Sequence, residues 1–125
     1  MTATRFLDRL SVLVVEDEAI ISFLIEDMLG ELGARDVRHA GTLAAALAQL
    51  DTRMPDLAVL DVNLGGERVY PVAERLEAAS IRFVFITGYG KSGMDPRWYS
   101  HIVVQKPFNL EAMAAALRDA LLPSP

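Results

Sequence analysis

The chain has 125 residues, 52% of them hydrophobic, and no cysteine, which excludes thiol nucleophiles, iron–sulfur clusters and cysteine zinc sites. Its 12 basic and 17 acidic side chains give a net charge of −5, which argues against nonspecific binding to nucleic acid or to anionic membranes. The length fits one domain, residues 1–125 with a core over about 11–121, and without a secretory signal or a membrane-spanning apolar run we expect a cytoplasmic protein.

Short apolar runs alternate along the chain with segments whose apolar residues recur at helical spacing. The first run, Ser11–Val15, is rich in β-branched residues and is typical of a strand buried on both faces. From Ala19 the period changes to that of an amphipathic helix, which Gly33 ends. The predicted elements are, in chain order, a strand at 11–15, a helix at 19–32, a strand at 36–40, a helix at 43–50, a strand at 57–60, a helix at 69–76, strands at 81–86 and 102–104, and a helix at 110–121.

The helical period is lost between the last two predicted strands. The segment Gly88–Trp98 holds three glycines and a proline, so a fourth helix there must be short or frayed. Elsewhere the order of strand and helix predicts parallel strands joined by right-handed crossovers. We therefore expect an α/β fold with one parallel sheet and helices on both of its faces.

Polar side chains follow the predicted strands, at the edge where open parallel sheets bind ligands. Glu16 and Asp17 follow the first strand, Asp61 the third, Thr87 the fourth and Lys106 the fifth. Converging carboxylates repel one another, and a divalent cation removes that penalty; oxygen ligands without histidine or cysteine suit Mg²⁺. A nearby lysine and hydroxyl would stabilise a phosphoryl group, and a carboxylate held among them can attack phosphorus to give an acyl phosphate.

Four strings in this order, each at a predicted strand end, resemble the receiver domain of two-component response regulators: VLVVEDE, VLDVN, FITGYG and VVQKPF. The resemblance runs from about Ser11 to Leu121. It implies a doubly wound five-stranded sheet in the order 2-1-3-4-5, a flavodoxin-like topology. It also implies that Asp61 accepts a phosphoryl group from a sensor histidine kinase or a phosphotransfer protein.

The resemblance assigns further roles to the polar residues. Asp17 and Asp61 would bind Mg²⁺ together with the backbone carbonyl of Asn63. Glu16 stands where receivers more often have aspartate, and its longer side chain would reach the metal through a water molecule. Lys106 would bind the phosphoryl group, and its bond to the following proline would be cis.

The switch of this chain departs from the usual receiver pattern. Thr87 matches the switch hydroxyl, but Val103 stands where receivers usually carry the tyrosine or phenylalanine that relays phosphorylation. The string Phe85–Tyr89 instead resembles the FATGUY subclass of stand-alone receivers, so Tyr89 is the expected relay. We expect the glycine-rich segment after Thr87 to be mobile until Asp61 is phosphorylated. Trp98 and Tyr99 are interpreted either as an exposed contact for a partner or as a local clasp on this segment.

Two other classes of function compete with a receiver. A small phosphatase with an aspartate nucleophile needs a second carboxylate two residues later, where this chain has Asn63. A flavin-binding electron carrier needs a phosphate loop after the first strand, where Glu16 and Asp17 would repel phosphate. We therefore expect a non-enzymatic phosphoacceptor, monomeric or weakly dimeric, that acts on a downstream protein partner, either alone or as the receiver part of a longer response regulator.

Overall fold

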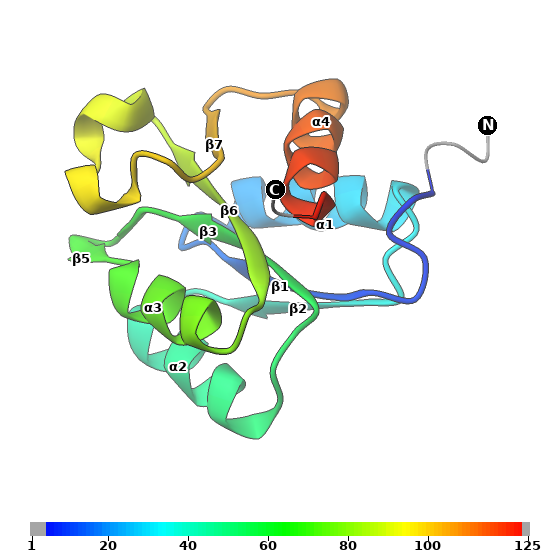
Figure 1. The fold of residues 1–125 in the computed structure, drawn as a ribbon, viewed down its shortest axis with the longest axis horizontal. Helices are drawn as coiled ribbons and strands as arrows, with labels where there is room; N and C mark the ends of the chain where they lie inside the picture. Colours follow the sequence, from blue (N-terminus) through cyan, green and yellow to red (C-terminus); the bar gives the residue numbers. More distant parts are fainter. Residues whose placement is uncertain (1–4, 124–125) are drawn as a thin grey trace.

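Five parallel strands form the central sheet of the computed structural model, which describes residues 5–123 (Figure 1). The ends of the predicted 1–125 domain, residues 1–4 and 124–125, lie outside the described residues. The strands are β1 (Ser11–Val15), β2 (Asp36–Ala40), β3 (Leu57–Asp61), β6 (Arg82–Thr87) and β7 (Val103–Gln105). Their order across the sheet, β2-β1-β3-β6-β7, confirms the predicted order 2-1-3-4-5 and the doubly wound, flavodoxin-like topology.

Helices cover both faces of this sheet. The helices are α1 (Ala19–Glu31), α2 (Leu43–Thr52), α3 (Tyr70–Ala78) and α4 (Leu110–Leu121). In Figure 1, α1 and α4 lie on one side of the sheet, and α2 and α3 lie on the other. Among residues 5–123, no helix is long and apolar enough to cross a membrane.

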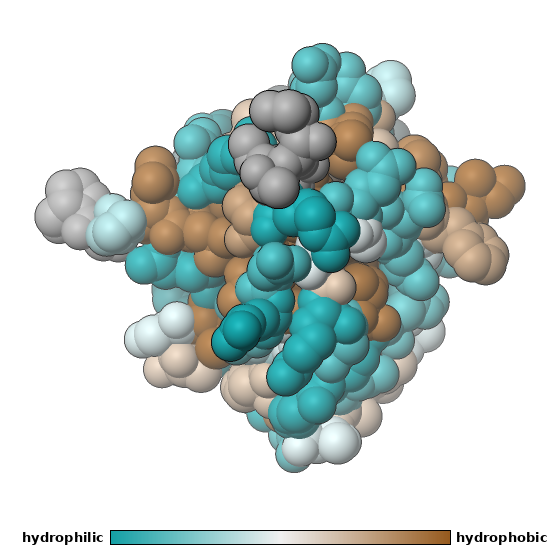
Figure 2. Space-filling view, turned by 90° about the vertical axis from the view of Figure 1, so that its right-hand side faces the viewer, coloured by the Kyte–Doolittle hydropathy of each residue, from teal (hydrophilic) through white to brown (hydrophobic). Residues whose placement is uncertain are grey.

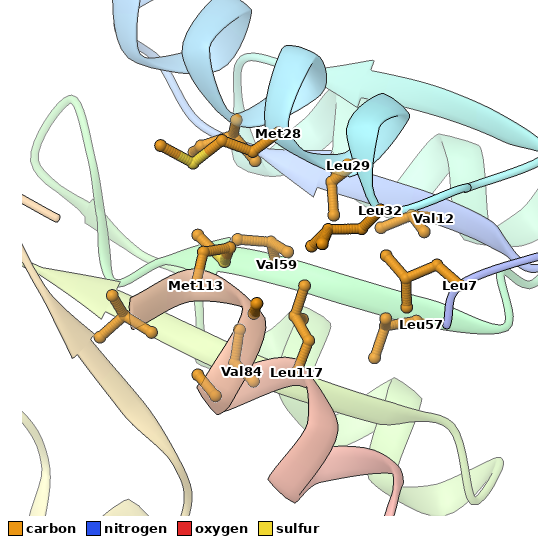
Figure 3. Close-up of a cluster of buried hydrophobic side chains, with 14 of the residues drawn as sticks. Leu7, Val12, Met28, Leu29, Leu32, Leu57, Val59, Val84, Met113 and Leu117 are labelled. Carbon is orange, nitrogen blue, oxygen red and sulfur yellow. The ribbon is translucent and has the colours of Figure 1, made fainter. Parts of the chain in front are cut away.

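The strands are buried on both faces because successive side chains enter opposite halves of the core. In β1, Val12 and Val14 pack in the half with α1 and α4, whereas Leu13 and Val15 pack in the half with α2 and α3. Figure 3 shows the first half, in which side chains of three strands meet those of the two helices: Val12, Val59, Val84, Met28, Leu29, Met113 and Leu117. Figure 2 shows the end of the molecule where β1 and β2 begin, with hydrophilic side chains across its centre and hydrophobic ones beside them. The polar strand ends lie at the other end.

A small hairpin that was not among the predicted elements lies around Gly65 and Gly66. The two-residue strands β4 (Asn63–Leu64) and β5 (Glu67–Arg68) pair antiparallel on either side of these glycines. Both glycines have a positive φ, +59° and +96°, a conformation that side-chain-bearing residues rarely adopt. The backbone N–H of Gly66 also donates to Asn63 Oδ1 at 3.0 Å, which closes the turn.

The predicted fourth helix is present only as two 3₁₀ helices, η2 (Gly90–Gly93) and η3 (Pro96–Trp98). The first half of this segment, residues 88–93, has no buried side chain in the described structure. The second half, residues 94–98, is anchored by buried side chains. Trp98 is 1% exposed and stacks on Tyr70, with ring centroids 5.9 Å apart, and Met94 is also buried. Trp98 is therefore the local clasp on this segment, and the mobility expected for the glycine-rich residues 88–93 stays a prediction.

The last helix, α4, begins with a side-chain cap at its N-terminus. Asn109 Oδ1 accepts a hydrogen bond from the backbone N–H of Ala112 at 2.8 Å. We expect Asn109→Ala to lower the free energy of unfolding by about 1 kcal/mol, because a backbone donor loses its partner. Urea denaturation would measure this loss. Asn109→Ser should keep most of the stability, and an equal loss in both variants would contradict the capping role.

Candidate functional site

The carboxyl ends of the central strands bring three acidic side chains together. Glu16 directly follows β1, Asp17 comes next, and Asp61 is the last residue of β3. One carboxylate oxygen from each residue lies within 4.8 Å of those of the other two. Glu16 and Asp61 are buried and Asp17 is exposed, so the cluster is open to solvent on one side.

Lys106 reaches the same cluster from the end of β7. Its Nζ lies 3.3 Å from Asp61 Oδ2 and 3.3 Å from Glu16 Oε1. Its backbone N–H donates to the carbonyl of Thr87 at 2.8 Å, which continues the pairing of β6 and β7 beyond the last strand residue. The Lys106–Pro107 peptide bond is cis, as the resemblance implied.

The acidic cluster holds three carboxylates close to one ammonium, that of Lys106. Burial, the largest cause, and the neighbouring Asp61 together raise the pKa of the Glu16 carboxyl to about 7, although the backbone N–H of Glu18 and the Lys106 ammonium lower it. For Lys106, burial lowers the pKa, but the carboxylates of Asp61 and Glu16 outweigh it and the net shift is upward. Glu16 Oε1 is buried, and its contact with the Lys106 ammonium at 3.3 Å is an ion pair without the geometry of a hydrogen bond. Three carboxylates held this close together fit the preference of Mg²⁺ for oxygen ligands.

Thr87 ends β6 beside this cluster and is buried. Its Oγ1 accepts a hydrogen bond from the backbone N–H of Tyr89 at 3.1 Å, so the hydroxyl is tied to the segment that follows. The Tyr89 side chain itself is 76% exposed. Asn63 donates its backbone N–H to Asp61 Oδ1 at 3.4 Å.

Residues 12–118 match the family described as the response regulator receiver domain. The chain belongs to this family. This confirms the resemblance drawn from the four strand-end strings. The chain is also similar to solved receivers that are nearly its own length. It is 43% identical to SdrG from Sphingomonas melonis Fr1, with a TM-score of 0.82, covering 91% of this chain and 98% of SdrG.

The chain is also similar to more distant relatives. The receiver domain of the PhyR response regulator from Erythrobacter litoralis is 27% identical, with a TM-score of 0.82, and the match covers 94% of this chain and 95% of that one. The sensory transduction protein LytT from Bacillus subtilis is 28% identical over 116 residues, which are 87% of this chain and 47% of LytT. The chain thus spans about half the length of the curated relatives that it matches.

Receiver domains are phosphoacceptors of two-component systems that bind Mg²⁺ in an acidic pocket, and this receiver holds Glu16, Asp17 and Asp61 where they could bind a metal ion. A cavity of about 530 Å³ opens over the cluster. The residues that line it include six of the predicted site residues, namely Asp17, Asp61, Asn63, Thr87, Tyr89 and Lys106.

Three side chains near the receiver's acidic cluster were not predicted as site residues. Glu18 Oε1 lies 3.4 Å from Lys106 Nζ, and the acidic run after β1 was the available signal for it. His39 Nε2 lies 2.9 Å from the backbone carbonyl of Glu16, a contact that depends on the pairing of β1 and β2. Arg68 lines the cavity because of the unpredicted hairpin.

Proposed function

We propose that this receiver accepts a phosphoryl group on Asp61 from a phosphohistidine of a sensor histidine kinase or phosphotransfer protein, and that the phosphorylated form changes its binding to a downstream protein. The observation that supports this most strongly is the position of Lys106 Nζ, 3.3 Å from the buried Asp61 carboxylate and 3.3 Å from a second carboxylate. An ammonium held there can neutralise charge on a phosphoryl group that joins Asp61. We also propose that the protein is located in the cytoplasm.

The chemistry is an in-line transfer. A carboxylate oxygen of Asp61 forms a bond to phosphorus, while the phosphorus–nitrogen bond of the donor breaks and its electron pair stays on the imidazole. Lys106 neutralises the transferred oxygens, and the Thr87 hydroxyl can donate to one of them once it turns from Tyr89. Glu16, Asp17 and Asp61, with the Asn63 carbonyl, would hold Mg²⁺, which supplies the second positive charge that the transferred group requires.

An apolar surface beside the site supports a protein as the donor. At the start of α1, Ile20 is 82% exposed and Phe23 is 75% exposed. Ile21 and Leu24 of the same helix line a hollow of about 310 Å³ with Lys106–Phe108. Large apolar side chains exposed together are typical of surfaces that contact another protein.

The direct test is incubation with acetyl phosphate and Mg²⁺, followed by intact-mass measurement. We expect a gain of one acid-labile phosphoryl group, since acyl phosphates hydrolyse in acid. A protein that gains no phosphoryl group under these conditions, and none from a panel of purified phosphorylated histidine kinases, would contradict the proposal.

The switch residues lead to a separate prediction. No side chain of residues 88–93 is buried, so we expect rapid amide hydrogen exchange there when Asp61 is free. Addition of beryllofluoride, a phosphoryl mimic, should slow this exchange at least about tenfold, or ~1.4 kcal/mol, as Thr87 turns towards the site and orders the segment. Equal exchange in both states would contradict an order–disorder switch.

Substitution of Tyr89 tests whether the movement of Thr87 changes the affinity for a partner protein. Its side chain is exposed while its backbone N–H is bound to Thr87, so movement of the threonine must displace it. Tyr89→Ala should abolish the dependence of partner affinity on phosphorylation, and Tyr89→Phe should preserve it if the ring is the relay. An unchanged dependence in Tyr89→Ala would exclude the relay role.

A further inference from the structure

Arg68 forms a bridge between two segments that flank the acidic cluster. Its Nη1 donates to the backbone carbonyl of Gly93 at 3.3 Å, across 25 residues of sequence. Arg68 belongs to β5 of the hairpin, and Gly93 is the last residue of η2. The bridge therefore connects the chain that follows Asp61 with the chain that follows Thr87.

The hairpin register places Arg68 close to the site. Arg68 pairs with Asn63, the residue two positions after Asp61. Arg68 and Gly93 both line the 530 Å³ cavity above the cluster, and both also line a neighbouring hollow of about 450 Å³. The contact between Arg68 and Gly93 thus lies between the cavity and the neighbouring hollow. It also forms part of the rim of the cavity above the acidic cluster.

The segment that Arg68 contacts has only local hydrogen bonds besides this one, within residues 5–123. Tyr89 N–H donates to Thr87 Oγ1, Ser92 Oγ donates to the Tyr89 carbonyl, and Met94 N–H donates to the Lys91 carbonyl. These bonds shape the segment but do not hold it to the rest of the domain, whereas just beyond it the backbone N–H of Asp95 donates to Tyr70 Oη at 2.8 Å. Within residues 88–93, the Arg68 guanidinium is therefore the side-chain group of the described structure that ties the segment to the mouth of the cavity.

We infer that Arg68 is a positioning residue that holds residues 88–93 over the mouth of the site and limits the access of water to phosphorylated Asp61. This inference rests on the proposed function. In the hydrolysis that it limits, a water oxygen bonds to phosphorus, and the bond between phosphorus and the Asp61 carboxylate breaks. The electron pair returns to the carboxylate, and the protons of the water leave with inorganic phosphate.

The experiment compares Arg68→Ala with the parent chain after phosphorylation by acetyl phosphate and removal of the excess reagent. We expect the half-life of the acyl phosphate to fall about three- to tenfold, the range for loss of one solvent-exposed hydrogen bond of ordinary net strength. Amide exchange of residues 88–94 should rise, and that of residues 96–101 should not, because Trp98 anchors the second half. Arg68→Lys, which keeps one donor, should restore part of both properties.

Arg75→Ala is the matched control. Arg75 is also a partly exposed arginine, but its ion pair, 2.7 Å to Asp51, lies on α2 and α3 away from the cavity. Its loss should leave the lifetime and the exchange of residues 88–94 unchanged.

Each outcome of this comparison decides a different point. A shorter half-life of the acyl phosphate without faster amide exchange of residues 88–94 would show that Arg68 acts only through its charge. Faster exchange without a shorter half-life would show that the segment does not limit the access of water to phosphorylated Asp61. Either result, or no change in both properties, overturns the inference. If the parent chain itself takes up no phosphoryl group, the proposed function fails instead.

Discussion

Replacement of Asp61 by asparagine is expected to abolish phosphorylation by acetyl phosphate while leaving the fold intact. The amide of asparagine has nearly the shape of the carboxylate but is not a nucleophile towards phosphorus. Asp61 is buried beside Glu16 and 3.3 Å from Lys106 Nζ, so loss of its charge removes one attraction as well as one repulsion between carboxylates. The metal-free variant should therefore melt near the temperature of the parent chain. Intact mass and thermal unfolding measure the two expectations.

Asp51→Asn is the control for this substitution, because Asp51 is an exposed aspartate paired with Arg75 far from the cluster. It should be phosphorylated to the same extent as the parent chain. Acid-labile phosphate on Asp61→Asn at the parent level would show that another residue is the acceptor. A variant that fails to fold would be recognised by its circular dichroism, and Asp61→Glu would then repeat the test with a displaced nucleophile.

The sequence predicted the sheet well because long apolar runs carry a strong signal. The strands β1, β3 and β6 are buried on both faces, and their uninterrupted apolar residues matched that environment directly. The three carboxylates and Lys106 could be predicted to converge, because the carboxyl ends of parallel strands meet at one edge. Chain direction and strand order were therefore enough to predict which residues form most of the candidate site.

The features that escaped prediction depend on contacts between distant segments. A two-residue strand such as β4 shows no period, so the hairpin that places Arg68 at the site left no pattern in the sequence. The segment after Thr87 has helix-breaking residues throughout, and its anchoring by Trp98 depends on Tyr70 of α3. Glycine content correctly indicated the absence of a regular helix, but the stacking of Trp98 on Tyr70 could not be predicted from it.

Mg²⁺ should raise the melting temperature of the receiver, because it binds the folded acidic cluster and not the unfolded chain. At ten times its dissociation constant, the ion should add about 1.4 kcal/mol to the free energy of unfolding. For a domain of this size the melting temperature should rise by about 5 °C. Thermal unfolding in EDTA and at several concentrations of Mg²⁺ would measure the effect.

Asp17→Ala should remove most of this rise, since Asp17 is the exposed member of the three carboxylates that lie within 4.8 Å of one another. The same substitution should stabilise the metal-free protein slightly, because one of three repelling charges is lost. Asp27→Ala, which removes an exposed carboxylate of α1 outside the cluster, should leave the response to Mg²⁺ unchanged. A metal site formed by these three carboxylates would be contradicted if millimolar Mg²⁺ did not change the melting temperature of the parent chain. It would also be contradicted if Mg²⁺ raised the melting temperature of Asp17→Ala as much as that of the parent, because loss of a carboxylate at Asp17 and at Asp27 would then have the same effect.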